Sequence, residues 1–208
     1  MKMKILAVIT ALALVSNVEA KTQTFGIDLS GSNPLLTHKN FAHAASQYVS
    51  NQIRTLKSGD IVQIMTFGSR GDAQNLINSR ITIGRRNRPE KVAQLVSKMI
   101  RKLPERANVE QSSTNLVAWL DFTDGFDCKN GSDILVITDG LESSSYISGK
   151  DLIEGRKKLP APDVDLKGCN LTFYGLGAGW QPKHVKTVRK AWRDWSKQAN
   201  ASFKAIIP

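Results

Sequence analysis

The sequence is poor in cysteine and histidine, and it has no long apolar segment after its first twenty residues. Its two cysteines share no metal-ligand spacing with His38, His43 or His184, which argues against a zinc site. The Gly-x-Ser-x-Gly motif and the Ser/His/Asp order of nucleophilic hydrolases are also missing. Because a membrane helix needs roughly 20 consecutive apolar residues, the chain after Ala20 is not expected to span a membrane.

The amino terminus has the pattern of a secretory signal. Lys2 and Lys4 precede an uncharged apolar run from Ile5 to Val15, and Val18-Glu19-Ala20 offers small residues on both sides of a cleavage position. We therefore predict a signal peptide over residues 1–20, cleaved near Ala20, and a single domain over residues 21–208. This assignment predicts a periplasmic or secreted protein.

Basic side chains outnumber acidic ones by 29 to 18, so the formal net charge of the precursor is +11. Removing Lys2, Lys4 and Glu19 leaves +10 (11 − 2 + 1). Such a charge favours acidic partners, anionic membrane surfaces or nucleic acid, and it also serves solubility alone. The densest basic clusters either dock an acidic or phosphate-bearing partner or form solvated loops; they are Arg85, Arg86 and Arg88, with Arg70 and Arg80 nearby, and Arg156-Lys157-Lys158.

Short apolar runs alternate with segments of helical periodicity, as in an α/β fold with a mostly parallel sheet. Runs suited to buried strands cover residues 22–29, 61–67, 133–138, 171–176 and 202–207, and a short edge strand with antiparallel pairing is expected over 80–84. A first helix is expected to follow the polar stretch that ends at Pro34 and to run to about Lys57. Further helices are expected over 89–103, 115–126 and 183–200. The apolar face of the 89–103 helix should include Leu95, and Trp192 and Trp195 should lie in the core.

Polar side chains follow two of these strands at their carboxyl ends. Asp28, Ser30 and Ser32 follow the first strand, and Asp139 follows the strand that begins near residue 133. In an open parallel sheet, ligands bind beyond the carboxyl ends of the strands, where the strand order reverses. Thr114 starts a helix between these segments and should point into the same crevice. Carboxylates and hydroxyls of this kind suit Mg²⁺, a hard cation that prefers oxygen ligands.

These residues resemble the metal-ion-dependent adhesion site of von Willebrand factor A domains, whose signature is Asp-x-Ser-x-Ser, a later Thr, and an Asp before Gly. Asp28, Ser30, Ser32, Thr114 and Asp139 occupy the five positions, and the element order fits over nearly the whole chain after the leader. The resemblance implies a doubly wound, Rossmann-like three-layer α/β sandwich with a six-stranded, mostly parallel sheet and one short antiparallel edge strand. It also implies one Mg²⁺, or Mn²⁺ or Ca²⁺, per chain.

Cys128 and Cys169 would meet an oxidising compartment, where such a pair forms a disulfide more often than a redox or metal site. The alternative is two unrelated buried thiols. In the topology that the resemblance implies, each cysteine precedes one of two neighbouring strands. The bridge would then lie at the opposite end of the sheet from the metal.

The resemblance implies a binding module without enzymatic activity, in which the metal engages an acidic residue of another protein. The segment Leu141–Lys167, which contains Tyr146, leaves the metal face and should select the partner. Nucleic acid is not the expected partner. Two alternatives remain: a structural subunit of an envelope secretion, pilus or conjugation apparatus with a non-essential metal site, and a Mg²⁺-dependent phosphodiesterase or nuclease.

Overall fold

The structure is a computed structural model, and it describes residues 20–69, 77–105, 110–121, 126–128 and 131–208. The apolar run of the predicted signal peptide lies outside the described residues, as do Arg70 and residues 122–125 of the expected 115–126 helix. Among the described helices, none is long and apolar enough to cross a membrane.

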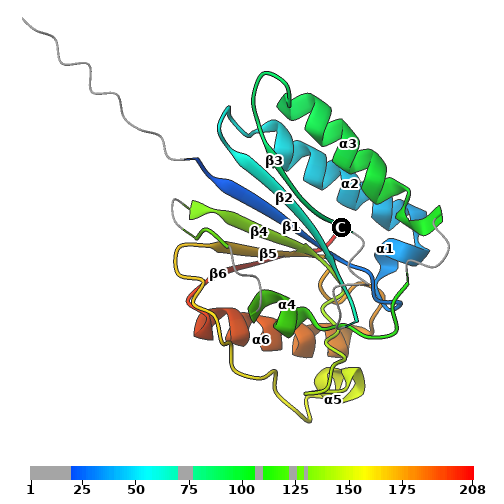
Figure 1. Cartoon of the computed structure of the whole chain (residues 1–208). Helices are drawn as coiled ribbons and strands as arrows, with labels where there is room; N and C mark the ends of the chain where they lie inside the picture. The colour runs from blue at the N-terminus through cyan, green and yellow to red at the C-terminus, as the bar shows by residue number, and fades with distance from the viewer. Residues whose placement is uncertain (1–19, 70–76, 106–109, 122–125, 129–130) are drawn as a thin grey trace, which may run out of the picture.

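A six-stranded sheet forms the centre of the molecule (Figure 1). The strand order is β3-β2-β1-β4-β5-β6, and all pairs are parallel except β2 with β3. The strands are β1 (Thr22–Asp28), β2 (Ile61–Phe67), β3 (Asn78–Thr82), β4 (Asp133–Ile137), β5 (Asn170–Tyr174) and β6 (Ser202–Ile206). This topology confirms the predicted α/β class, the six strands and the antiparallel edge.

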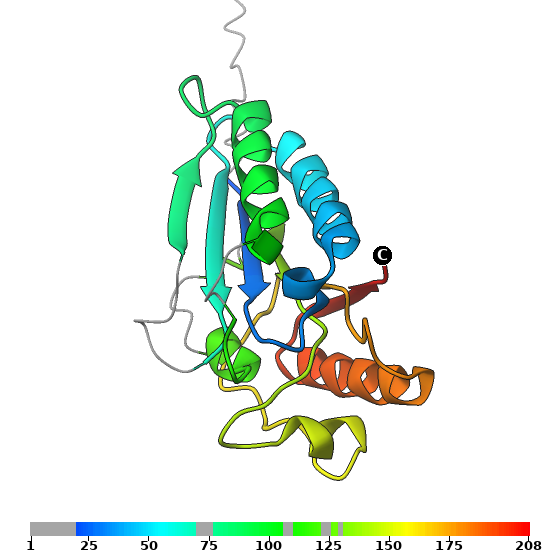
Figure 2. The same cartoon turned by 90° about the vertical axis from the view of Figure 1, so that its right-hand side faces the viewer.

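Helices cover both faces of the sheet, which makes three layers (Figures 1 and 2). Side chains alternate along each parallel strand, so Phe25 and Ile27 contribute to one core and Ile134 and Val136 to the other. The first core is closed by α1 (Pro34–Thr37), α2 (Lys39–Arg54), α3 (Pro89–Arg101) and the 3₁₀ turn η2 (Leu103–Glu105). The second is closed by α4 (Leu116–Asp121) and α6 (Pro182–Gln198), with α5 (Gly149–Ile153) beside α6.

The tryptophans of the second core are buried where the sequence predicts them. Trp192 and Trp195 of α6 are 0% and 1% exposed, as predicted, and their rings pack edge to face. Gly26 of β1 lies under Trp119 of α4, where an added Cβ would come within 2.5 Å of the indole ring. The glycine therefore allows the α4 layer to approach the sheet closely.

Four local predictions differ from the structure. The first helix is broken at His38, whose backbone is extended (φ −120°, ψ 103°), so that α1 and α2 are separate. Leu95 is 62% exposed, because it lies about 60° around α3 from Val92, outside the buried arc. The edge strand covers Asn78–Thr82 rather than 80–84, since its pairing with β2 already begins at Met65 and Asn78. The short helix α5 lies within the segment Leu141–Lys167, where no helix was expected.

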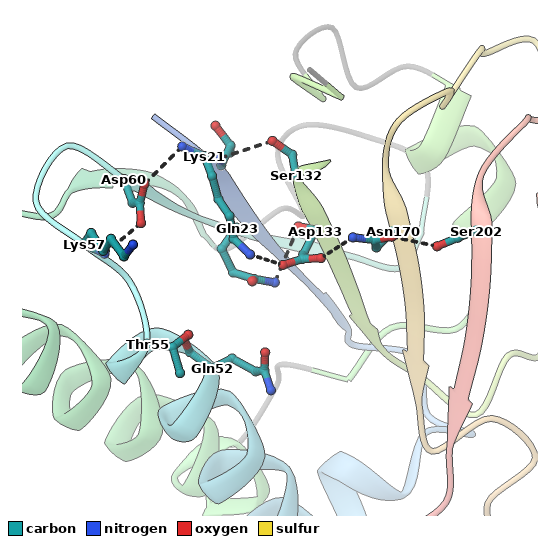
Figure 3. Close-up of polar contacts among 11 residues, drawn as sticks. Lys21, Gln23, Gln52, Thr55, Lys57, Asp60, Ser132, Asp133, Asn170 and Ser202 are labelled. Carbon is teal, nitrogen blue, oxygen red and sulfur yellow. Dashed lines mark hydrogen bonds and ion pairs between the residues drawn. The ribbon is translucent and has the colours of Figure 1, made fainter. Parts of the chain in front are cut away.

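At the amino-terminal ends of the strands, polar side chains join one strand to the next (Figure 3). The Lys21 backbone N–H donates to Asp60 Oδ1 at 3.1 Å, and its ammonium group pairs with Asp133. Asn170 Nδ2 donates to Asp133 Oδ1 at 2.9 Å, and Ser202 Oγ donates to Asn170 Oδ1 at 2.9 Å. These contacts connect β1, β4, β5 and β6 along one end of the sheet.

The disulfide lies at this same end. Cys128 precedes β4 and Cys169 precedes β5, and the two sulfurs are bonded. This confirms the predicted pairing and its position before two neighbouring strands. The opposite end of the sheet, at the carboxyl ends of the strands, therefore carries no covalent constraint from the bridge.

Candidate metal centre

Asp28 and Asp139 lie at the carboxyl ends of the adjacent strands β1 and β4. Asp28 is the last residue of β1, and Asp139 follows β4 by two residues. The strand order reverses between β1 and β4, because β2 and β3 extend the sheet on one side and β5 and β6 on the other. Both side chains are 0% exposed. Two buried carboxylates thus occupy the position where ligands bind in folds of this class.

Both oxygens of Asp28 accept hydrogen bonds. Oδ1 accepts one from the Ser30 backbone N–H at 2.8 Å, and Oδ2 accepts one from Thr138 Oγ1 at 2.6 Å. The Thr138 hydroxyl also accepts from the Gly140 N–H at 2.9 Å. Thr138 therefore connects the carboxylate that ends β1 to the turn that follows β4.

Asp139 is oriented by contacts from three segments. Its Oδ1 accepts the Leu141 N–H at 3.0 Å, its Oδ2 accepts the indole N–H of Trp180 at 3.1 Å, and the Ser32 hydroxyl also hydrogen-bonds to the carboxylate. Ser32 Oγ lies 3.3 Å from Ser30 Oγ. Asp28, Ser30, Ser32 and Asp139 are therefore joined in one continuous set of contacts.

The loop after β1 is held in place by Asn33. Its side-chain N–H₂ donates to the carbonyls of Asp28 at 2.8 Å and of Ile137 at 3.2 Å, while its Oδ1 accepts the Leu35 N–H at 3.1 Å. Asn33 thus caps α1 and also bridges the ends of β1 and β4. The backbone of the Asp28–Ser32 turn is consequently fixed relative to the neighbouring strand.

Thr114 reaches this region through the backbone of its loop. The N–H and C=O groups of Thr114 pair with those of Ser143 at 3.1 and 3.0 Å. Three residues earlier, Gln111 pairs with Leu29 and Gly31. The Thr114 loop is therefore held between the segments that carry Asp28 and Asp139. Among the described residues, however, no hydrogen bond joins the buried Thr114 hydroxyl directly to either carboxylate.

The electrostatics of the carboxylate pair favour a cation. Burial, and after it the charge of Asp139, raise the pKa of Asp28 from 3.8 to about 7, against the hydrogen bonds from Thr138 and Ser30. Burial also raises the pKa of Asp139, although Leu141, Trp180 and Ser32 stabilise its charged form. None of the ion pairs among the described residues includes either carboxylate. A divalent cation would supply the missing positive charge, so the donor set fits one.

A third buried acid, Glu142, serves a helix end. Its Oε2 accepts the N–H groups of Leu116 and Val117 at 2.8 and 3.1 Å, in the first turn of α4. Burial raises its pKa to about 7. In the part of the chain that the structure describes, no group of three or more His, Cys, Asp or Glu side chains is arranged to hold a metal. The candidate centre therefore has two carboxylates, supplemented by hydroxyls.

The turn after Asp139 requires glycine and is attached to α6. Gly140 has φ of 79°, and an added Cβ would come within 2.1 Å of the Leu176 side chain. Its carbonyl accepts the indole N–H of Trp192 at 2.8 Å, and the Asp139 carbonyl accepts the Gly177 N–H at 2.8 Å. The backbone at Asp139 and Gly140 is thus held by the loop that follows β5 and by α6.

Sequence reasoning missed four residues that shape the centre: Asn33, Thr138, Glu142 and Trp180. Thr138 and Asn33 stand next to recognised motif residues, and their short polar side chains beside a strand end are a usable signal. Trp180 lies 41 positions from Asp139, and nothing local in the sequence connects the two. Only the packing of the β5–α6 loop brings that indole to the carboxylate.

No protein-family model and no curated protein matches the chain. Among solved structures it is similar to a von Willebrand factor type A protein from Catenulispora acidiphila, with a TM-score of 0.50, 14% identity and 90% of this chain covered. It spans 39% of the length of that protein. An aerotolerance-related membrane protein from Bacteroides fragilis gives a TM-score of 0.47 at 10% identity, covering 90% of this chain and 92% of that one. Manganese-loaded TRAP protein from Plasmodium vivax gives a TM-score of 0.46 at 17% identity, and the match covers 83% of this chain and 63% of that one.

The likeness to the Catenulispora structure covers 90% of the chain, and at 14% identity it concerns the fold. The chain has the fold of a von Willebrand factor A domain.

Proposed function

We propose that the protein is an exported, metal-dependent binding module for adhesion or assembly, in which one divalent cation engages an acidic residue of a partner protein. Asp28, Ser30, Ser32, Thr114 and Asp139 would hold the cation, which we expect to be Mg²⁺, with Mn²⁺ or Ca²⁺ as substitutes. The observation that carries the proposal is the pair of fully buried carboxylates without a basic partner among the described residues.

The ligand types explain why an acidic group would be attracted. Neutral hydroxyls contribute oxygen lone pairs but no negative charge, so a dication held by them and by only two carboxylates would stay electron-poor at its open position. Mg²⁺ readily accepts a further oxygen in its octahedral shell. The chain's own residues would orient and bury the two carboxylates, through Thr138 and Trp180. Because a partner carboxylate carries charge as well as an oxygen, it is favoured over a neutral ligand.

The accessibility of the candidate ligands indicates the direction of approach. Asp28 and Asp139 are buried, whereas Ser32 is exposed. A partner would therefore approach across the loop that follows β1. The segment Leu141–Lys167 leaves from the same end, and Tyr146 within it is 50% exposed. We assign partner selection to this segment.

Calorimetric titration of Mg²⁺ and Mn²⁺ into the purified protein tests the site. We expect one ion per chain in the wild type and none in the Asp28→Ala, Asp139→Ala double variant. Adding a carboxylate-bearing ligand to the metal-loaded protein should then produce a second binding event. If the double variant binds metal as the wild type does, the site assignment is wrong.

The same protein distinguishes the two alternative functions. A phosphodiesterase or nuclease would cleave single-stranded or duplex DNA in the presence of Mg²⁺, and we expect no cleavage above that of the double variant. A structural subunit with a non-essential metal site would assemble with its partners equally well after both aspartates are replaced. Partner binding that is lost with the two carboxylates supports the adhesion role instead.

A further inference from the structure

A groove of about 710 Å³ lies between the segment that follows α5 and the second half of α6. Leu152 and Trp195, both 1% exposed, lie among its lining residues, together with the half-buried Leu159. Leu159 and the half-buried Ala191 give the groove an apolar floor, and Leu152 and Trp195 lie buried beneath it. The groove belongs to the outer helix layer, whereas the candidate metal centre lies at the carboxyl ends of the strands.

The rim of the groove is strongly basic. One aspartate, Asp194, lines it. The four lysines that line it are all exposed: Lys157, Lys158, Lys190 and Lys197. Lys190 pairs with Asp194, and Lys157 lies 3.9 Å from a carboxylate oxygen of Asp151. Lys158 and Lys197 take part in none of the ion pairs among the described residues. Lys158 also attracts Asp194 electrostatically, but four lysines against one aspartate leave the groove with net positive charge above an apolar surface.

We propose that this groove binds an acidic segment of another polypeptide, with apolar side chains against Leu159 and Ala191 and carboxylates at Lys158 and Lys197. Opposite charge at the rim and apolar contact at the centre are the usual complementarity of a protein interface. The proposal goes beyond the metal centre, because the groove shares no residue with it and needs no cation.

The shape and lining of the groove favour a polypeptide over other polyanions. A lipid bilayer presents a nearly flat anionic surface, which would contact the lysines but leave the concave apolar floor uncovered. Single-stranded nucleic acid is bound largely by stacking of bases on accessible aromatic rings. Among the described residues that line the groove, Trp195 alone is aromatic, and its ring is buried. A chain that alternates acidic and apolar side chains satisfies both parts of the groove.

The test uses a fluorescent peptide of about ten residues made of Glu and Leu, titrated in EDTA and followed by polarisation. Two variants of equal charge change are compared: Lys158→Glu with Lys197→Glu in the groove, and Lys183→Glu with Lys186→Glu on the same helix outside it. Circular dichroism confirms that both variants are folded. We expect the groove variant to lose about tenfold or more in affinity and the control variant less than about twofold.

Two further arms identify the occupant. A Glu/Gly peptide of equal charge should bind at least about fivefold more weakly than the Glu/Leu peptide, because it lacks apolar contact with the floor. Vesicles containing anionic phospholipid should bind both variants alike. Equal losses in the two variants, equal binding of the two peptides, or vesicle binding that is lost only in the groove variant would each overturn the proposal.

Failure here is distinguishable from failure of the metal-dependent function. Peptide binding in EDTA should be unchanged by Asp28→Ala with Asp139→Ala, and metal binding should be unchanged by the groove substitutions. Each surface is thus tested with the other one removed.

Discussion

The indole N–H of Trp180 donates a hydrogen bond to Asp139 Oδ2 at 3.1 Å, which ties the loop after β5 to a candidate metal ligand. Trp180→Phe keeps an aromatic ring but removes this donor. Because the carboxylate would lose part of its orientation, we expect the dissociation constant for Mg²⁺ to rise about fivefold, equivalent to about 1 kcal/mol. Calorimetry measures the change.

A matched control is available on α6. The indole N–H of Trp195 has no hydrogen-bond partner among the described residues. Trp195→Phe therefore removes the same chemical group without affecting Asp139. We expect this variant to lose some stability, because the ring is buried, and to keep the wild-type affinity for Mg²⁺. An equal loss of affinity in both variants would refute the orienting role of Trp180.

Replacing Asp28 by Asn should separate metal binding from stability. The substitution keeps the size of the side chain and removes one charge from a buried pair of like charges. In EDTA at pH 8, we expect the melting temperature to rise by a few degrees relative to the wild type. The increase in melting temperature that Mg²⁺ causes in the wild type should be absent in this variant. A lower melting temperature in EDTA would show that the buried charge is not unfavourable.

The stability of the metal-free protein should decrease as the pH rises. The pKa of Asp28 is 3.8 ordinarily and about 7 in the folded state, so between these values the folded chain retains a proton that the unfolded chain has released. The free energy of unfolding therefore falls through this window and levels off above it. We expect thermal melts in EDTA to show a lower melting temperature at pH 8 than at pH 5.5, and Mg²⁺ to restore stability at pH 8.

Glu142 contributes to this pH dependence with the same sign, because burial also raises its pKa to about 7. In EDTA, Glu142→Gln should remove the part of the pH dependence of stability that Glu142 causes. The part that Asp28 causes should remain. The two effects are additive if the acids act independently. A metal-free protein whose stability increases between pH 5.5 and 8 would contradict the assignment for both acids.

Removing the disulfide should lower stability without affecting the metal. The bridge closes a loop with a sequence separation of 41, for which chain entropy gives about 4 kcal/mol. We expect Cys128→Ser with Cys169→Ser to lower the melting temperature by about 10 °C. The affinity for Mg²⁺ should stay within about twofold of the wild type, since the bridge lies at the opposite end of the sheet. Loss of metal binding in a folded variant would contradict this separation.

The sequence predicts the layers well because burial is periodic along it. Each parallel strand is a short apolar run, and the buried tryptophans of α6 follow helical spacing, so local patterns suffice. The break at His38 and the short helix α5 were not predicted, although the Ser148 side chain caps α5 by accepting the Asp151 N–H, which is a local signal. Leu95 shows the limit of local patterns, because an apolar residue at the margin of a helical stripe is buried only if a neighbouring element covers it.

The candidate centre was predictable in part. Asp28, Ser30 and Ser32 form a compact motif, and Asp139 follows a recognisable strand. The supporting contacts were not predictable, since the Thr138 hydroxyl lies 110 positions from Asp28 and the Trp180 indole lies 41 positions from Asp139. Such pairs depend on strand order, and one sequence contains no local signal for it.

The central position of β1 has a consequence for the order of folding. Its neighbour on one side, β4, begins more than a hundred residues later in the chain, at Asp133. A chain that becomes available from its amino terminus onward therefore cannot complete its sheet, or assemble both carboxylates, until more than half of it has appeared. Contacts this distant in sequence slow folding. The rate at which Mg²⁺ binding appears during refolding would consequently report the rate at which β4 docks against β1.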